Sequence, residues 1–132
     1  AGMINTTQVI IKESFEIEKL TIAKASLRSI IYNLISNAIK YHSPKRPPHI
    51  NISTYQENDY TILSIKDNGL GLNNDQQAKL FHMFKRFHSH VEGTGIGLYI
   101  VKRTMDNING KIKIESRLNE GTELKLYFKN ND

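Results

Sequence analysis

Four polar residues in the first third of the chain share one strip of a predicted helix. Their spacing of i, i+4, i+7 and i+8 keeps them on one side of the helix, beside its apolar face. The four are Asn33, Asn37, Lys40 and Tyr41. An asparagine oxygen in such a strip can serve as a neutral ligand for a hard cation such as Mg²⁺. A solvated helix flank carries the same residue types, so the strip taken alone favours a surface role.

A glycine-rich turn follows a predicted strand, with the sequence Asp67-Asn68-Gly69-Leu70-Gly71. An aspartate at a strand end can accept a hydrogen bond from an exocyclic amine, such as the one on C6 of adenine. Glycine removes the side chain where a ring must approach the backbone. The same residues are common in simple turns, and a turn is the better interpretation of this segment by itself.

A second glycine-rich segment, Gly93-Thr94-Gly95-Ile96-Gly97-Leu98, opens another predicted helix. Unpaired N–H groups at a helix N-terminus bind phosphate, and glycines let the phosphates come close. The segment is neither a Walker loop, because no Gly-Lys-Ser/Thr follows, nor the G-x-G-x-x-G dinucleotide pattern. A flexible hinge is the alternative for this segment.

The elements that position these segments follow from periodicity. Apolar residues at three- and four-residue steps predict a helix over residues 25–42, and Gly110 would end the last helix. Alternating or β-branched stretches predict strands at 9–11, 50–55, 60–66, 111–115 and 122–128, and further helices are predicted at 75–84 and 95–108. This order predicts an α+β two-layer sandwich: a mixed or antiparallel sheet of about five strands, with about three helices on one face.

The composition of the chain excludes some kinds of function and disfavours others. The chain has 132 residues, a mass of 15.1 kDa and no cysteine, which indicates one domain without disulfides, thiolate chemistry or cysteine-bound zinc. The formal charge of +5 suits an anionic ligand, and the basic residues are scattered, so a solvated basic surface is favoured over a nucleic-acid footprint. No apolar run approaches the ~20 residues that cross a bilayer.

Taken together, the segments resemble the nucleotide-binding domain of sensor histidine kinases, which has the Bergerat fold of the wider ATPase group that includes gyrase, the mismatch-repair ATPases and the large heat-shock chaperones. Residues 33–41 look like the N box of that family, 67–71 like its G1 box, 80–87 like its F box and 93–98 like its G2 box. Gly121-Thr122 is similar to the end of its last glycine motif, although Asn119 stands where the fuller motif has glycine. The resemblance covers residues 7–129, leaving 1–6 as an N-terminal tail or expression remnant and 130–132 as a C-terminal tail.

This resemblance implies ATP and Mg²⁺ as cofactors and gives each matching residue a role. Asn37 would hold Mg²⁺, with Asn33 as a second ligand or water holder. Lys40 would approach the phosphates, Tyr41 would pack near the purine, and Asp67 would read the adenine amine.

The later motifs would supply the phosphate contacts. Arg86 would contact the γ-phosphate, and Gly93, Gly95 and Gly97 would let a lid fold over the triphosphate. The loop 85–94 is expected to be poorly ordered without nucleotide. The resemblance implies catalytic roles for Asn33, Asn37, Lys40 and Arg86, and further nucleotide contacts at Gly69, Gly71, Leu72, Phe84, Thr94, Ile96, Leu98 and Thr122.

The residue type at position 33 distinguishes members of the group that hydrolyse ATP from those that transfer its phosphoryl group. Relatives that hydrolyse ATP carry glutamate there, and a neutral amide is a poor general base. The substitution favours transfer of the γ-phosphoryl group to a histidine on a separate dimerisation and phosphoacceptor domain, with a response regulator downstream. No histidine of this chain lies in an acceptor context, so the chain alone is not expected to phosphorylate itself.

The sequence is also compatible with three other functions. The alternatives are an ATP-binding regulatory module without transfer, a hydrolytic ATPase of the same group, and a basic nucleic-acid-binding domain. The resemblance implies a cytoplasmic, monomeric fragment that touches neither membrane nor nucleic acid, whether or not its parent protein is membrane-anchored.

Overall fold

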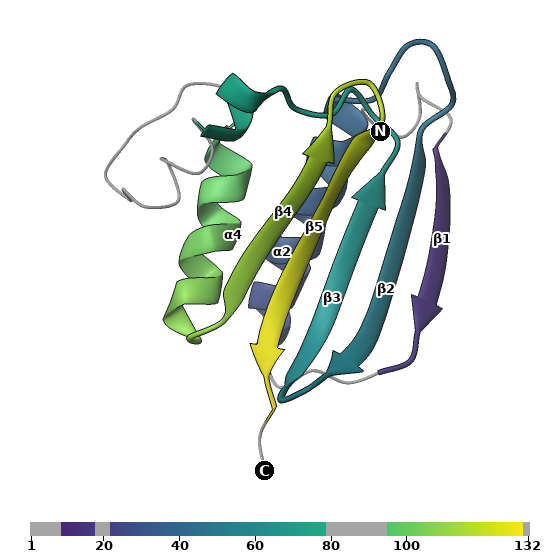
Figure 1. Ribbon diagram of the computed structural model, residues 1–132. Coiled ribbons are helices and arrows are strands. Elements are labelled where there is room, and N and C mark those ends of the chain that lie inside the picture. The colour runs from purple at the N-terminus through teal and green to yellow at the C-terminus, as the bar shows by residue number, and fades with distance from the viewer. Residues whose placement is uncertain (1–8, 18–21, 79–94, 131–132) are drawn as a thin grey trace.

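The computed structural model describes residues 9–17, 22–78 and 95–130. Its sheet has five strands in the order β1-β2-β3-β5-β4. The strands are β1 (Ile10–Phe15), β2 (His49–Glu57), β3 (Tyr60–Asp67), β4 (Lys111–Arg117) and β5 (Gly121–Lys129), and the two longer helices are α2 (Lys24–Lys40) and α4 (Gly95–Asn107). Residues 74–78 are also helical. Figure 1 shows the strands side by side, with α2 and α4 behind them.

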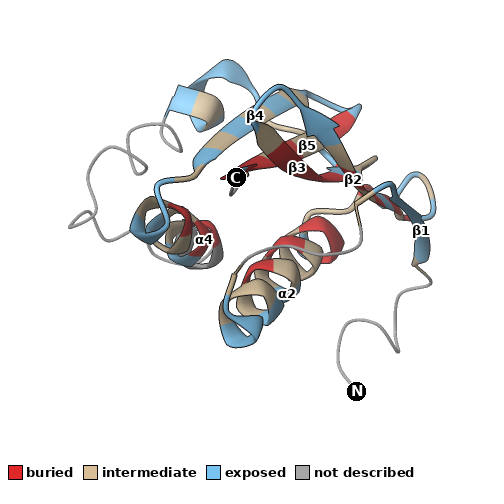
Figure 2. Cartoon of the chain, turned by 90° about the horizontal axis from the view of Figure 1, so that it is seen from below, coloured by how far each residue is buried: buried red, intermediate tan, exposed pale blue. Residues whose placement is uncertain are grey.

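The sheet is mixed, which is one of the two arrangements predicted. β1 pairs with β2 in parallel, whereas β2–β3, β3–β5 and β5–β4 are antiparallel pairs. Two hairpins make the tight connections, and each turn contains an asparagine with positive φ: Asn58 at 56° and Asn119 at 67°. Asparagine tolerates this left-handed conformation better than most residues with a side chain. Both helices lie on one face of the sheet (Figure 2), which confirms the α+β two-layer sandwich.

The hydrophobic core lies between the helices and the covered face of the sheet. Its most deeply buried side chains come from α2, α4 and the central strands: Ile30, Leu34, Ile50, Val101, Met105 and Leu126 are each at most 1% exposed. Burying an aliphatic side chain of this size contributes about 1.5–3 kcal/mol, so this layer supplies most of the stabilisation that fixes α2 against the sheet.

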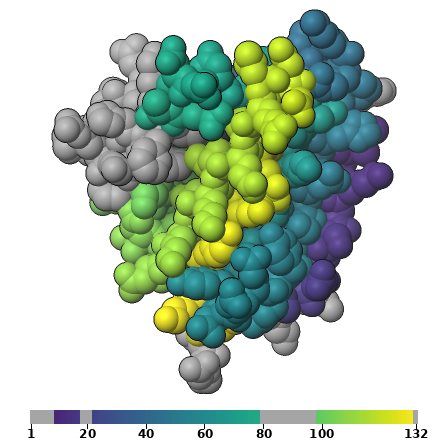
Figure 3. Space-filling view, in the orientation of Figure 1, coloured from purple at the N-terminus to yellow at the C-terminus, as the bar shows by residue number. Residues whose placement is uncertain are grey.

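The opposite face of the sheet has no covering helix among the described residues (Figure 3). Ile62 is nevertheless fully buried there. It pairs with Tyr127, whose ring lies 5.8 Å from that of Tyr60. Lys111 Nζ lies 5.0 Å from the ring centroid of Tyr60, and Lys113 Nζ lies 5.2 Å from that of Tyr127. Aromatic rings and lysine stems thus shield Ile62 from water on this face.

Most element boundaries differ from the sequence-based prediction by one or two residues, and β1 differs by more. The helix predicted over 25–42 ends at Lys40, and the strand predicted at 9–11 extends to Phe15. All six residues of β1 are exposed, so its backbone pairing with β2, not burial, defines it. The helix predicted over 75–84 is confirmed at 75–78, and its remainder lies outside the described residues.

Candidate nucleotide-binding site

Three segments that are far apart in sequence meet at one end of the sandwich, at the top of Figure 1. The end of α2 meets the turn after β3, because Leu70 N donates to the carbonyl of Tyr41 at 2.9 Å. The same turn meets the β4–β5 hairpin, because Asn119 N donates to the carbonyl of Leu70 at 2.7 Å. The predicted N box and G1 box are therefore in direct contact, and the first turn of α4 lies at the same end (Figure 1).

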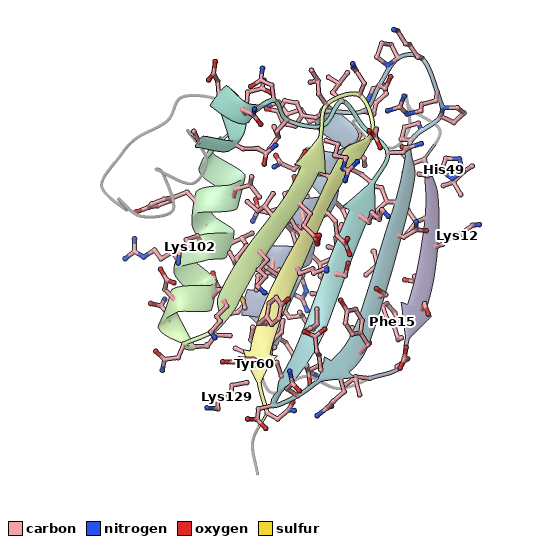
Figure 4. All side chains as sticks on the ribbon, in the orientation of Figure 1. Lys12, Phe15, His49, Tyr60, Lys102 and Lys129 are labelled. Atoms are coloured by element: carbon pink, nitrogen blue, oxygen red, sulfur yellow. The ribbon has the colours of Figure 1, made fainter. Side chains whose placement is uncertain are left out.

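This end of the sheet is distinct from the end where the Tyr60 ring lies. Figure 4 shows His49 at the upper end of β2, and Tyr60 and Lys129 at the lower end of the sheet. His49 N donates to Asn68 Oδ1 at 2.8 Å, which ties the start of β2 to the turn after β3. The upper end is thus where strand ends and helix ends converge.

Asp67 is the last residue of β3, and one of its carboxylate oxygens is held by two backbone groups. Oδ1 accepts hydrogen bonds from Gly69 N at 2.9 Å and Thr122 N at 3.2 Å. Within the described part of the chain, Oδ2 accepts none. Burial raises the pKa of this carboxyl above its ordinary value, and the two N–H groups oppose that rise. An oriented, partly desolvated oxygen of this kind is suited to accept a hydrogen bond from a ligand amine.

The glycines of this turn have a different physical reason from the predicted one. A Cβ at Gly69 would lie 2.5 Å from the carbonyl oxygen of Tyr41. Gly71 has a φ of 69°, and a Cβ there would overlap the carbonyl oxygen of Arg117. The protein's own backbone therefore requires both glycines, independently of any approaching ring.

The polar strip of α2 lies where the spacing predicted. Asn33 and Asn37 are half-buried and flank the buried Leu34 and Ala38. The Asn33 amide nitrogen donates to the carbonyl of Ser29 at 2.8 Å. The Asn37 side-chain amide makes no hydrogen bond with any described residue, so both its oxygen and its nitrogen are available to a ligand.

Tyr41, at the C-cap of α2, carries an orphaned polar atom. Its hydroxyl is buried and finds no hydrogen-bond partner among the described residues. Burial raises the pKa of this phenol, so it stays neutral at physiological pH. An unpaired buried hydroxyl costs about 1–3 kcal/mol, which a polar ligand atom would offset. The Lys40 Nζ lies 5.9 Å from the same ring.

Arg46 is a residue of this site that sequence reasoning missed. It lies in the loop between α2 and β2, and its guanidinium donates to three backbone carbonyls. Nε donates to Asn68 O at 2.6 Å, and Nη2 donates to Gly69 O at 2.8 Å and to Asn119 O at 2.7 Å. Its partners are between 22 and 73 residues away in sequence, and a local pattern carries no signal for such contacts.

Ser116 on β4 was also missed. Its Oγ accepts a hydrogen bond from Leu72 N at 2.8 Å and lies 2.8 Å from Thr122 Oγ1. Gln77 donates from Nε2 to the carbonyl of Leu72 at 3.0 Å. The predicted contact residues Leu72 and Thr122 are therefore brought together through Ser116.

The remaining predicted residues are described only in part. Gly95 begins α4, as predicted for a glycine-rich helix start, and Gly97 and Ile96 lie in its first turn. Leu98 is 8% exposed and belongs to the hydrophobic core. Four predicted site residues lie outside the described residues, as does the predicted loop 85–94: Phe84, Arg86, Gly93 and Thr94.

The described residues hold neither a cluster of metal-binding side chains nor a membrane-spanning helix. No cluster of three or more histidine, aspartate or glutamate side chains is found there, so these residues contain no all-protein metal cage of that type. A magnesium ion held by an asparagine amide and ligand phosphates needs no such cage. No helix in the ranges that the structure covers is long and apolar enough to span a bilayer.

Comparison with known proteins shows the family to which this chain belongs. Residues 23–132 match the family described as histidine kinase-, DNA gyrase B- and HSP90-like ATPase. The chain therefore belongs to this ATPase family, and it is an ATP-binding domain, as the sequence motifs predicted.

The curated relatives that match this chain over part of their length include sensor proteins and histidine protein kinases. The sensor protein RprX of Bacteroides fragilis is 37% identical over 101 residues, which is 74% of this chain and 20% of that protein. Cyanobacterial phytochrome A of Nostoc is 38% identical over 104 residues, which is 77% of this chain and 13% of that protein. The chain spans about a fifth or less of the length of these relatives.

Solved structures confirm the fold. The mycobacterial sensor histidine kinase MprB superposes with a TM-score of 0.74 at 19% identity, covering 96% of this chain and 88% of that one. A nucleotide-free catalytic domain of the histidine kinase ThkA superposes with a TM-score of 0.73 at 22% identity, covering 96% and 81%. At these identities the likeness establishes the architecture alone.

Proposed function

We propose that this chain is the catalytic domain of a sensor histidine kinase, which donates the γ-phosphoryl group of Mg²⁺-bound ATP to a histidine on a separate dimerisation and phosphoacceptor domain. A response regulator would then receive the group. The observation that carries the proposal is the environment of Asp67. Its Oδ1 is held by two backbone N–H groups and its Oδ2 is unpaired among the described residues, beside the end of α2.

Adenine recognition follows from this arrangement. Oδ2 would accept a hydrogen bond from the adenine amine, because Oδ1 is already occupied by the N–H groups of Gly69 and Thr122. Tyr41 would pack near the base, and its buried hydroxyl would gain a polar partner there. Both features match a nucleotide better than an apolar ligand, since each leaves a buried polar group that only a polar ligand satisfies.

Phosphate and metal binding would involve the strip on α2. The free amide of Asn37 supports its assignment as the protein ligand of Mg²⁺, with Asn33 holding a second position or a water molecule. Bound Mg²⁺ would neutralise charge on the phosphates during transfer. Lys40 is exposed at the end of the strip, where its charge can reach the phosphates. Arg86 would complete the contacts at the γ-phosphate.

Transfer is favoured over hydrolysis by Asn33. Its amide nitrogen is bound to the preceding helical turn at Ser29 O, and a neutral amide cannot take a proton from water. A hydrolytic ATPase of the same family remains the second candidate on family membership. Turnover that is lost in Asn33→Ala would favour it.

The chain's own described histidines support an acceptor elsewhere. The His42 ring lies 2.7 Å from the carbonyl of Ile39 through Nδ1, and His49 begins the paired strand β2. Neither position resembles a histidine exposed on a helix for phosphorylation. We infer that the acceptor lies on another domain and that the chain works in the cytoplasm, where ATP is abundant.

A reconstitution experiment tests the proposal. The chain is mixed with the separately produced dimerisation domain of its parent protein and γ-labelled ATP. Acid-labile label is expected on the dimerisation domain, and none on the chain alone. Asp67→Asn is the matched variant, because it keeps the side-chain size and should abolish labelling. A chain that binds ATP but never labels its correct partner would instead be a regulatory module.

A further inference from the structure

We propose that Arg46 is the positioning residue for the adenine-reading carboxylate, an inference that rests on the function proposed above. Arg46 lies in the loop that follows α2 and is half-buried. Its guanidinium holds three backbone carbonyls, those of Asn68, Gly69 and Asn119, at 2.6–2.8 Å. These carbonyls come from the two turns that frame Asp67, so one side chain joins both.

The first link runs through a single peptide plane. The carbonyl of Asn68, held by Arg46 Nε, and the N–H of Gly69, which donates to Asp67 Oδ1, belong to the same peptide unit. Because that unit is planar and trans, its C=O and N–H point in opposite directions. The guanidinium on one side therefore fixes the direction of the N–H on the other. A rotation of this peptide would break both hydrogen bonds together.

The second link runs through the β4–β5 hairpin. Arg46 Nη2 joins Gly69 O to Asn119 O, and Asn119 N in turn donates to Leu70 O. The chain continues from this hairpin turn to Thr122, whose N–H is the other donor to Asp67 Oδ1 at 3.2 Å. Both donors that orient the carboxylate thus come from segments that Arg46 holds in place.

The geometry suits arginine in particular. One guanidinium presents several N–H donors in a rigid, planar fork, whereas a lysine ammonium is a point charge on a flexible stem. The three described acceptors of Arg46 are all main-chain oxygens, so its effect on the nucleotide is transmitted through Asp67. Loss of the guanidinium should leave the carboxylate in place but free to turn.

The test compares ATP with purine riboside triphosphate, which lacks the 6-amino group. Dissociation constants for both are measured with Mg²⁺ on Arg46→Ala, Arg46→Lys and the unaltered chain, by competition with a fluorescent nucleotide. Arg46→Ala should reduce the preference for ATP about tenfold, and Arg46→Lys should fall between. Lys45→Ala removes the same charge one residue away, where the exposed lysine side chain makes no hydrogen bond or ion pair with any described residue, and should leave the preference unchanged.

A double variant separates positioning from general loss of structure. In Asp67→Asn, the preference for the 6-amino group should already be absent, and adding Arg46→Ala should not change it further. Thermal unfolding is followed in parallel. If Arg46→Ala fails to fold, the Arg46→Lys ratio decides.

Failure of the positioning role of Arg46 can be distinguished from failure of the proposed function. If Arg46→Ala or Arg46→Lys lowers the melting temperature while the ratio of the two dissociation constants stays at its native value, the positioning role is wrong and Arg46 is only structural. If Asp67→Asn itself leaves the ratio unchanged, adenine reading by Asp67 is wrong and the proposed function loses its basis.

Discussion

Replacing Tyr41 by phenylalanine should have opposite effects on the free chain and on its nucleotide complex. The Tyr41 hydroxyl is buried and has no partner among the described residues. Removing a polar atom in that situation relieves a desolvation cost of about 1–3 kcal/mol instead of breaking an interaction. Tyr41→Phe is therefore expected to raise the free energy of unfolding of the free chain by about 1 kcal/mol, the lower end of that range.

The corresponding shift in melting temperature follows from chain length. With an unfolding entropy of roughly 2.1 cal/mol/K per residue, 1 kcal/mol corresponds to about 4 °C for this chain. With saturating Mg²⁺ and ATP, the variant should lose a ligand hydrogen bond worth about 0.5–1.5 kcal/mol, so its affinity should fall roughly fivefold. The variant would thus be more stable when free and would gain less from the nucleotide.

Differential scanning fluorimetry with and without nucleotide measures both effects. Tyr32→Phe is the matched control, because Tyr32 lies on the same helix and is 68% exposed, so neither quantity should change. The reasoning is refuted if Tyr41→Phe destabilises the free chain by 1 kcal/mol or more. That result would mean that the hydroxyl has a partner within the protein.

Two further predictions concern the turns around the site. Because burial raises the pKa of Asp67 above 3.8, the charged carboxylate disfavours folding above the folded-state pKa, and this penalty disappears as pH falls below 3.8. The free energy of unfolding of Asp67→Asn should therefore be higher than that of the native chain at pH 7, and this difference should disappear on acidification. Urea titrations at several pH values between 7 and 3 would measure it, and an equal difference at every pH would contradict the prediction. At Asn119, with φ of 67°, alanine should cost about 1 kcal/mol and glycine should be neutral or stabilising. Equal stabilities of the two Asn119 variants in urea would show that the left-handed backbone is not strained.

Periodicity predicted the parts of the fold that are held by burial. The buried residues of α2 recur at helical spacing, and the strands β2 and β4 alternate between more buried and more exposed positions, so their apolar residues report their structure directly. β1 was predicted too short, because an exposed edge strand has no buried face to impose alternation on Ile10–Phe15.

The site was predictable where one residue type does the chemistry and less so where the backbone does. Motif and spacing indicated Asp67, Asn37 and Tyr41 as candidate site residues, and these roles stay predictions. Arg46 and Ser116 were not indicated, because each binds main-chain groups that are distant in sequence, and every residue has such groups. The turn glycines were expected for ligand approach, yet the carbonyls of Tyr41 and Arg117 already exclude a side chain there.

Calorimetric titration of Mg²⁺ and ATP into the chain and into Asp67→Asn tests the central claim most directly. In the variant, the amide oxygen must occupy the position that accepts the two backbone N–H groups, which turns the NH₂ group toward the adenine amine as donor against donor. The native chain should bind with measurable heat and the variant at least tenfold more weakly. No heat from the native chain at millimolar nucleotide, or equal affinity in both proteins, would contradict the account.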